Sequence, residues 1–280
     1  MSKNVIWWIG VKNPQLTEKY GGYDYFEYSK NTWKHFCERF DCEFVEFSEP
    51  VEEDLFKFRV NSSLCYCLRR ILMVYEWRFN PRPYSDDEAT DLLKNVVSAE
   101  TTDWHYNTHH KGYVTFLNNI EKELEDADPA KANGNYSQIG ELKRRFTWNH
   151  SGALLHDVYW EVMGGDGDSS KAPELSKALT SEFGSVDNWK ADFKASAFAA
   201  KLSGWGLLVY DSLYSQRLIN VLVDEHQYGA IWGGIPLISC DVFEHAYYHK
   251  DGPGRVKYID NFLGNLNWER IESRYLKHVG

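Results

Sequence analysis

The C-terminal two thirds of the chain opens with two segments in which apolar and aromatic residues recur every three or four positions. The first begins near Ser98 and the second spans roughly 141–163. A polar loop over about 126–138 separates them. This pattern predicts a two-helix hairpin over about 80–164. Four residues of the first helix follow one another at intervals of four and are expected on one face: His105, His109, Tyr113 and Leu117.

Beyond the hairpin the pattern changes towards strands. A Gly- and Asp-rich stretch, Gly164–Ser170, predicts a flexible linker. Two amphipathic helices are then expected over 174–183 and 186–198, and a charged final helix after Asn267-Trp268. Three short apolar runs between them predict strands: 203–211, 217–223 and 235–241. The fold class is therefore α+β, with a helical hairpin followed by an α+β domain that has a small three-stranded antiparallel sheet.

The first 78 residues read as a separate, small α/β-like extension of unknown role. Val5–Val11 and the run from Cys42 predict strands, while 25–40 and 64–77 have helical spacing. Two prolines and a Ser/Asp cluster in Asn80–Asp87 predict a boundary followed by a helix start. We therefore expect three parts: an extension over 1–78, a hairpin domain over 79–165 and an α+β domain over 166–280.

Composition narrows the class of protein. The 280 residues are 43% hydrophobic and 16% aromatic, which is sufficient for a real core. The net charge of −10 argues against binding to nucleic acid or to an anionic membrane. No membrane span is present, and Val5–Val11 favours a buried strand over a signal peptide. The odd, irregularly spaced cysteines favour reduced thiols, including the C-x-C pair, and a cytoplasmic location: Cys37, Cys42, Cys65, Cys67 and Cys240.

Candidate chemistry centres on the stretch DVFEHAYY. It carries Asp241 and His245 four residues apart, within reach of one metal ion, although such a pair can also be a structural hydrogen bond. His105 and His156 lie in the two predicted hairpin helices, and either alone reads equally as a core or surface histidine. Together, three imidazoles and a carboxylate without thiolates predict a mononuclear Mn, Fe or Zn site with an open position.

Aromatic residues gather in sequence around the candidate ligands. Such a shell limits water access and tunes the redox potential of a metal site, although aromatic residues at helical spacing are also ordinary core. The predicted shell consists of Trp104, Tyr113, Tyr159, Trp160, Trp205 and Phe243.

From about Pro81 onwards, the chain carries a series of short motifs in the order in which one known family has them. In sequence they are P-x-P-Y, H-x-x-x-H-H-x-x-Y-V, H-x-x-Y-W, F-G-S, G-W, D-x-x-E-H-A-Y-Y and N-W. The chain from about 80 to 280 resembles the iron/manganese superoxide dismutases, in an archaeal-like form. The resemblance implies a helical hairpin and an α+β domain with the metal between them. It also implies conversion of superoxide to dioxygen and hydrogen peroxide as one Mn or Fe ion cycles between the 3+ and 2+ states.

The resemblance assigns roles to individual residues. Metal ligands would be His105, His156, Asp241 and His245. Tyr113 and His109 would be the gateway and proton-relay residues. Trp160 and Trp205 would pack around the ligands. An outer-sphere hydrogen-bond donor distinguishes the metals. Many iron enzymes of the family have a Gln four residues before the second-helix ligand, and this chain has Gly152 there. The hydrogen bond to the metal-bound solvent would therefore come from His226, or from Gln227 in the neighbouring register. This arrangement favours manganese.

The resemblance also implies partners. Glu244 and Tyr248 would reach across a homodimer, which could pair further into a tetramer, and Arg255 would attract superoxide past the overall negative charge. The chain departs from the family at Phe243, where tryptophan is usual, and at Cys240. Two alternatives remain open: a non-catalytic metal-binding relative, and a bifunctional fusion whose N-terminal segment binds a ligand of its own.

Overall fold

The computed structural model describes residues 5–9, 34, 43–47, 76–201 and 203–279. The chain divides into two compact units, residues 1–72 and 73–280. In the first unit, β1 (Val5–Ile9) pairs in parallel with β2 (Glu43–Phe47). Both strands were predicted and both are confirmed. Most of the two predicted helices, and the C-x-C pair, lie outside the described residues; Trp77, at the end of one of these helices, is not helical.

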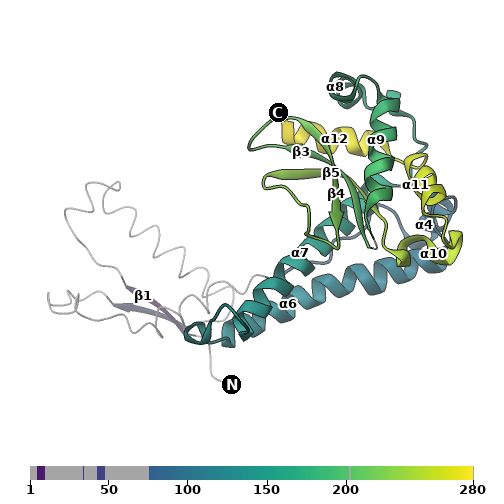
Figure 1. Cartoon of the computed structure of the whole chain (residues 1–280). Helices are drawn as coiled ribbons and strands as arrows, with labels where there is room; N and C mark the ends of the chain where they lie inside the picture. The colour runs from purple at the N-terminus through teal and green to yellow at the C-terminus, as the bar shows by residue number, and fades with distance from the viewer. Residues whose placement is uncertain (1–4, 10–33, 35–42, 48–75, 202, 280) are drawn as a thin grey trace, which may run out of the picture. The chain divides into compact units, whose positions relative to one another are not determined.

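The second unit opens with the helical hairpin. The segment from α5 to α6 is one continuous helical rod, and it packs side by side with α7 (Figure 1). Serine side chains accept hydrogen bonds from backbone N–H groups at the starts of α4, α5 and α7, as preferred N-caps do. The elements are α4 (Asp86–Leu93), α5 (Ala99–Asp103), η2 (Trp104–His110), α6 (Lys111–Asp126), the 3-10 turn η3 (Pro129–Lys131) and α7 (Gln138–Val162).

The segment η2 is a π-helix, which the sequence pattern did not reveal. Extra residues of this kind inside an α-helix widen one turn and occur frequently at functional sites. In a regular α-helix His110 would lie about 140° round the axis from His105. The wider turn brings both His105 and His110 into contact with the ring of His156, at centroid distances of 4.8 and 5.5 Å.

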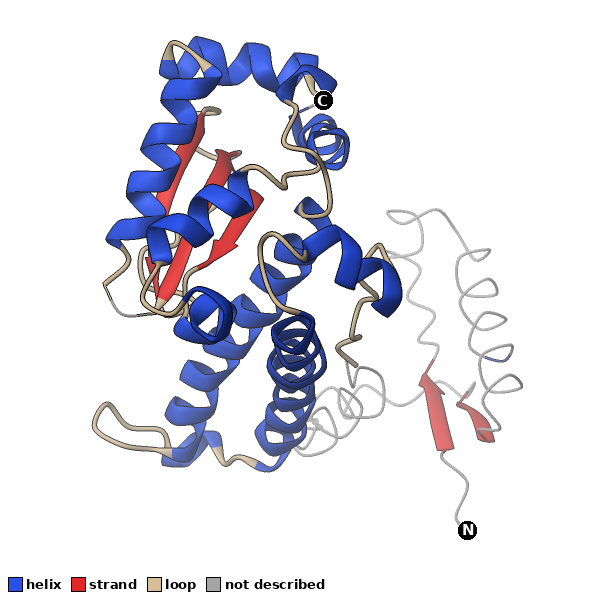
Figure 2. Ribbon diagram, turned by 90° about the vertical axis from the view of Figure 1, so that its right-hand side faces the viewer, coloured by secondary structure: helices blue, strands red, loops and turns tan. Residues whose placement is uncertain are grey.

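The remainder of the second unit is an α+β domain, as predicted. Its antiparallel sheet has the strand order β4-β3-β5 and is covered by helices (Figure 2). The 3-10 turn η4 (Ser169–Lys171) precedes the first helix of this domain. Helix α11 was not anticipated. The elements are α8 (Pro173–Phe183), α9 (Val186–Ala199), β3 (Gly204–Asp211), β4 (Leu218–Asp224), β5 (Gly234–Asp241), α10 (Glu244–Asp251), α11 (Arg255–Leu263) and α12 (Trp268–Val279).

One hydrophobic core joins the hairpin to the α+β domain. Trp160 of α7 and Trp205 of β3 are almost completely buried in the same cluster of side chains. Beside them, the Ser239 hydroxyl of β5 donates a hydrogen bond of 2.7 Å to the carbonyl of Leu155 in α7. This junction fixes the end of β5 against the middle of α7, where the candidate ligands meet.

The predicted flexibility of the linker 164–170 is wrong. The Gly165 and Gly167 N–H groups donate to the carbonyls of Asn265 and Leu266, at 2.9 and 3.1 Å. A Cβ atom added at Gly165 would lie 2.3 Å from the Leu266 carbonyl oxygen, so only glycine allows this approach. The linker is therefore held against the turn that precedes α12.

Trp77 attaches the start of the second unit to the hairpin. Its backbone N–H donates to Asn118 Oδ1 at 2.8 Å, and its carbonyl accepts from Asn118 Nδ2 at 3.0 Å. Its ring packs edge-on against Phe146 and His150. Among the described residues, every helix is too short or too polar to cross a bilayer.

Candidate metal centre

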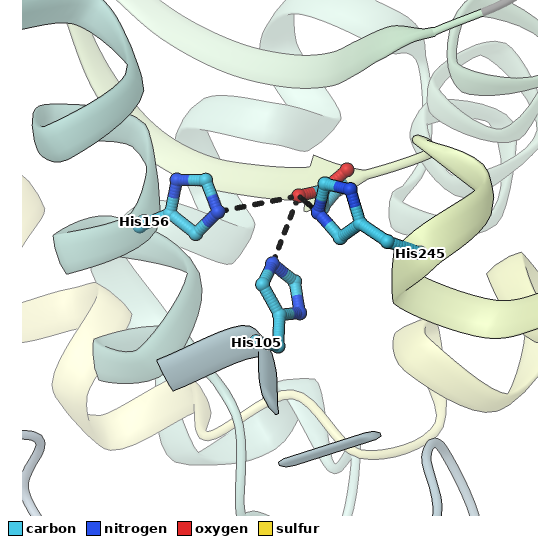
Figure 3. A group of neighbouring side chains, drawn as sticks. His105, His156 and His245 are labelled. Atoms are coloured by element: carbon cyan, nitrogen blue, oxygen red, sulfur yellow. Dashed lines mark hydrogen bonds and ion pairs between the residues drawn. The ribbon is translucent and has the colours of Figure 1, made fainter. Parts of the chain in front are cut away.

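Four side chains from four segments converge at the junction of hairpin and sheet. His105 comes from η2, His156 from α7, Asp241 from the last position of β5, and His245 from the first turn of α10. One ligand atom of each lies within 4.8 Å of the ligand atoms of the others. Figure 3 shows the three imidazoles pointing towards one another. The structure thus brings together the four predicted ligands.

The carboxylate lies at the centre of the group. The Nε2 atoms of His105, His245 and His156 lie 3.0, 3.3 and 3.6 Å from Asp241 Oδ2. His105, His156 and Asp241 are buried, whereas the His245 side chain is 21% exposed. Access from solvent therefore lies on the His245 side.

The hydrogen bonds of His156 show which of its nitrogens is free. Its Nδ1–H donates to the Gly152 carbonyl at 2.7 Å, which leaves a lone pair on Nε2. That Nε2 is buried and has no hydrogen-bond partner among the described residues. A bare nitrogen lone pair facing a carboxylate oxygen is repulsive unless a cation lies between them, so the donor set fits a bound metal ion.

Burial and pairing set the charges of these groups. Burial lowers the pKa of His105 to about 4, despite the opposing hydrogen bond to Asp241. Burial, together with the neighbouring His105, also holds the pKa of His156 well below its ordinary value. Burial alone would raise the pKa of Asp241, but interactions with His245 and His105 outweigh it and lower that pKa. The site thus presents buried neutral imidazoles and an ionised carboxylate, as metal binding requires.

His226 links the sheet to Tyr113. Trp205 Nε1–H donates to His226 Nδ1 at 3.0 Å, and His226 Nε2 lies 2.8 Å from Tyr113 Oη. Because an indole nitrogen can only donate, His226 Nδ1 must accept, and the imidazole proton is on Nε2. Gln227, the alternative in the neighbouring register, has a buried Oε1 without a partner among the described residues.

Gly152 makes room for this arrangement. A Cβ atom at position 152 would lie 2.8–3.0 Å from three atoms of the Tyr113 ring. The ring of Tyr113 therefore occupies the space that a side chain from α7 would need. With α7 excluded by Gly152, the hydrogen bond to Tyr113 comes from His226, which follows β4.

The other histidines of η2 flank the ligands on two sides. His109 is half-buried and stacks on His245, with ring centroids 4.1 Å apart. Burial, with the neighbouring His245 in the same direction, lowers the pKa of His109. His110 is buried behind His156 and lies 3.2 Å from a carboxylate oxygen of Asp157. His109 thus stands on the solvent side of the site and His110 on the opposite side.

The predicted aromatic shell is present with one exception. Tyr159 and Trp160 contact the ring of His105, while Tyr113 and Trp205 contact that of His156. Phe243 contacts His245. Trp104 instead points outward: it is 50% exposed and packs against His249.

Three further predicted residues lie outside the ligand group. Glu244 is exposed, and Tyr248 is 52% exposed on the same helix α10. Arg255 donates to the carbonyl of Ala200 just beyond the end of α9 at 2.5 Å and to Tyr247 Oη at 3.1 Å. Cys240 is a buried free thiol beside Asp241, and burial raises its pKa.

Sequence reasoning missed Trp148. Its ring lies 5.2 Å from that of Tyr113 and 4.8 Å from that of His226. Trp148 precedes His156 by eight residues, about two helical turns, so both lie on the same face of α7. That spacing is the signal that could have identified it.

Two sequence profiles of one family match most of the second unit. The profile described as iron/manganese superoxide dismutases, alpha-hairpin domain, matches residues 77–164. The profile described as iron/manganese superoxide dismutases, C-terminal domain, matches residues 171–274. The two matches cover the hairpin and the α+β domain in turn.

Individual relatives align over nearly their whole length. A protein of Haloferax volcanii named superoxide dismutase [Mn] 1 is 38% identical over 204 residues, covering 73% of this chain and 97% of that relative. A Halobacterium salinarum protein of the same name is 37% identical, covering 71% and 95%. A protein of Aquifex pyrophilus named superoxide dismutase [Fe] is 39% identical, covering 68% and 91%.

Proposed function

Because the chain belongs to the iron/manganese superoxide dismutase family, we propose that it is an oxidoreductase that disproportionates superoxide. Two superoxide anions and two protons would yield one dioxygen and one hydrogen peroxide. The metal ligands in this proposal are His105, His156, Asp241 and His245. The observation that carries the proposal is the buried His156 Nε2, which has no hydrogen-bond partner in the part of the chain that the structure describes and lies 3.6 Å from the Asp241 carboxylate.

The residues around the metal position would control access, orientation and protons. When bound, the Mn or Fe ion supplies one-electron exchange by alternating between the 3+ and 2+ states. The buried rings of Tyr159, Trp160 and Trp205 pack against His105 and His156 and shield these ligands from bulk water. The partly exposed His245, with His109 stacked on it, leaves one route for a small anion.

Tyr113 and His226 are proposed to manage the protons. His226 Nε2–H donates to Tyr113 Oη, so the phenol's own proton is free to point into the site. Burial, reinforced by the nearby Asp241 carboxylate, raises the pKa of Tyr113, which therefore keeps its proton at neutral pH. His109, at the solvent side, would return protons from water.

We favour manganese as the metal. The Tyr113 ring excludes a side chain at position 152, and a neutral histidine from beyond β4 takes the place of an α7 donor. Burial lowers the pKa of His226 to about 4, so this donor is uncharged. The two archaeal relatives named above carry manganese in their names, although the Aquifex relative carries iron.

We propose a homodimer built on the exposed face of α10, with a tetramer as a further possible assembly. Glu244 and Tyr248 are both exposed there, next to the ligand His245. Glu244 would reach the partner's His245, and Tyr248 would reach the partner's His109. Arg255 would provide local positive potential for the anionic substrate of a protein with a net charge of −10.

We further propose an antioxidant role in the cytoplasm, because the five cysteines are odd in number and irregularly spaced, which favours reduced thiols. For domains we propose the hairpin domain up to residue 165 and the α+β domain over 166–280, while the expected extension over 1–78 would end inside the second compact unit, which begins at residue 73. For expression without the extension, the cut belongs before residue 73, because Trp77 is bonded to the hairpin. If that shorter protein keeps full activity, the extension has a separate role.

The proposal is tested by measuring metal content and superoxide turnover on the same purified full-length protein. We expect about one Mn or Fe per chain, with activity. In His156→Gln we expect metal content to fall at least tenfold, because the remaining ligands leave a vacancy. His150→Gln is the matched control, since His150 lies on the same helix but outside the ligand group.

Each other outcome has a defined meaning. Stoichiometric metal without turnover, after reconstitution with both Mn and Fe, would favour the non-catalytic metal-binding alternative. Equal metal content in His156→Gln and the parent protein would refute the ligand assignment. Activity in the full chain but not in the protein from residue 73 onwards would support a functional contribution of the extension.

A further inference from the structure

We infer that Phe243 is a positioning residue for the His226–Tyr113 pair. Its phenyl ring stacks on the His226 imidazole, with centroids 4.8 Å apart and planes 15° from parallel. We propose that this flat contact sets the plane of His226 and, through it, the direction of the proton on the Tyr113 hydroxyl.

The two hydrogen bonds of His226 do not fix its ring alone. Both lie in the plane of the ring, one at Nδ1 from Trp205 and one at Nε2 to Tyr113. Small rotations of the ring about its Cβ–Cγ bond bend these hydrogen bonds more than they lengthen them, so the two bonds resist such rotation only weakly. A contact against the face of the ring opposes this rotation directly.

Phe243 is the neighbour that offers such a contact. Trp148, Tyr113 and Trp205 meet the His226 ring at interplanar angles of 65°, 79° and 48°. Those are edge or tilted contacts, whereas the Phe243 contact is near parallel.

The backbone of Phe243 is itself fixed to the ligand group. Its N–H donates to Asp241 Oδ1 at 2.8 Å, and its ring also lies 5.2 Å from that of His245. The residue therefore holds His226 in a constant position relative to two proposed ligands. A side chain without a flat face would keep the backbone bond but release the imidazole.

The structural part of this inference stands on geometry, and only its catalytic consequence rests on the proposed function. The test uses the full chain labelled with ¹⁵N-histidine and loaded with zinc, which is diamagnetic and accepts His and Asp ligands. The His226 signals are those that vanish in His226→Gln. In the parent we expect two separate nitrogen signals, with the proton on Nε2.

Phe243→Leu is expected to broaden the two His226 nitrogen signals, because the ring no longer holds one orientation towards Trp205 and Tyr113. Phe243→Tyr, which keeps a flat ring, should restore the parent pattern. Phe193→Leu is the control for loss of a buried phenyl ring elsewhere, since Phe193 is fully buried in α9 and contacts Trp189. It should leave the His226 signals unchanged.

In the Mn- or Fe-loaded protein, Phe243→Leu should lower kcat roughly tenfold with kcat/KM unchanged, as expected when proton delivery rather than substrate capture is impaired. If Phe243→Leu does not fold, Phe243→Met replaces it, because methionine fills the space with a flexible chain. A parent-like His226 pattern in the leucine variant overturns the inference, as does an equal change in Phe193→Leu. Absent turnover in every protein, with the nitrogen signals as expected, overturns the proposed function instead.

Discussion

At the scale of single residues, the site is built from donors and acceptors whose roles are forced by their neighbours. Trp205 can only donate, so His226 Nδ1 must accept and its Nε2–H is directed at Tyr113. The Gly152 carbonyl accepts a hydrogen bond from His156 Nδ1–H, so Nε2 is left for a cation. Each role follows from the partner, and a change of one residue should change the next.

Tyr113→Phe removes the hydroxyl at the end of this sequence of hydrogen bonds. We expect normal metal content, because the ligands are untouched, and a fall in kcat of roughly tenfold, equivalent to about 1.4 kcal/mol. The ratio kcat/KM should stay near the parent value. Pulse-radiolysis or stopped-flow kinetics at high superoxide would measure this, and an unchanged kcat would argue against the relay.

His150 offers a pH test away from the ligands. It is half-buried against Trp77 and Phe146, and burial lowers its pKa. The unfolded chain therefore binds a proton more readily than the folded one as pH falls through about 6.5, and stability decreases in that range. In urea unfolding, the loss of stability between pH 7.5 and 5.5 should be smaller in His150→Gln than in the parent. Parallel pH profiles would contradict the assignment.

The types of ligand could be predicted from sequence, but their contacts could not. Asp and His at positions 241 and 245, with His105 and His156 on helices, give a chemically sensible donor set from residue type and spacing alone. The pairing of His226 with Tyr113 joins residues 113 positions apart, and no local pattern encodes it. Trp104 shows the converse: it lies next to a ligand in sequence but faces outward.

At the scale of elements, the contact between α6 and α7 depends on a glycine. Gly152→Ala places a methyl group against the Tyr113 ring, and overpacking of this kind costs about 1–3 kcal/mol. Gly112→Ala is the matched control, because it is also helical and a Cβ there meets nothing within 4 Å. The control should gain up to about 1 kcal/mol from helix propensity.

Chemical denaturation of both glycine variants, with metal content held equal, would measure the difference. Opposite signs at the two positions are the expected result. Stabilisation of both by alanine would mean that Tyr113 moves aside at no cost, and then Gly152 would have no role in keeping α7 free of a side chain.

Helices and strands with a strong period of apolar residues could be predicted from the sequence. Local departures from that period, such as the π-helix, could not. The hairpin helices, α8, α9 and the three strands appear close to their expected bounds because each has a run of apolar residues at one period. The π-helix Trp104–His110 changes the period over only 7 residues, within a helix that continues on both sides. The glycine-rich sequence of the linker predicts flexibility. Glycine also allows close backbone packing, and sequence alone does not separate these two uses.

At the scale of the whole molecule, the proposed dimer gives a mass test. The parent should elute with a light-scattering mass of twice 32.7 kDa, or four times that mass for a tetramer. Glu244→Arg reverses a charge proposed to meet the partner's His245, so it should shift the mass towards one chain. Glu269→Arg, a charge reversal in the first turn of α12, should not. A monomeric parent would refute the interface.

Electrostatic steering gives the second test at this scale. A net charge of −10 repels superoxide, so capture requires a local positive potential, which we assign to Arg255. In the parent, kcat/KM should then fall roughly tenfold as salt shortens the Debye length from about 30 Å at 0.01 M to about 8 Å at 0.15 M. In Arg255→Gln the dependence should vanish or reverse, because only the overall repulsion is left to screen.

Lys257→Gln is the control for this experiment. It removes one positive charge from the same helix α11, and Lys257 is already paired with Asp251 at 2.7 Å. Arg255→Lys tests the charge separately from the hydrogen bonds that Arg255 donates to Ala200 and Tyr247. If steering depends on charge at this position, the lysine variant keeps the salt dependence and Lys257→Gln resembles the parent. Equal salt slopes in all four proteins would place the attracting charge elsewhere on the surface.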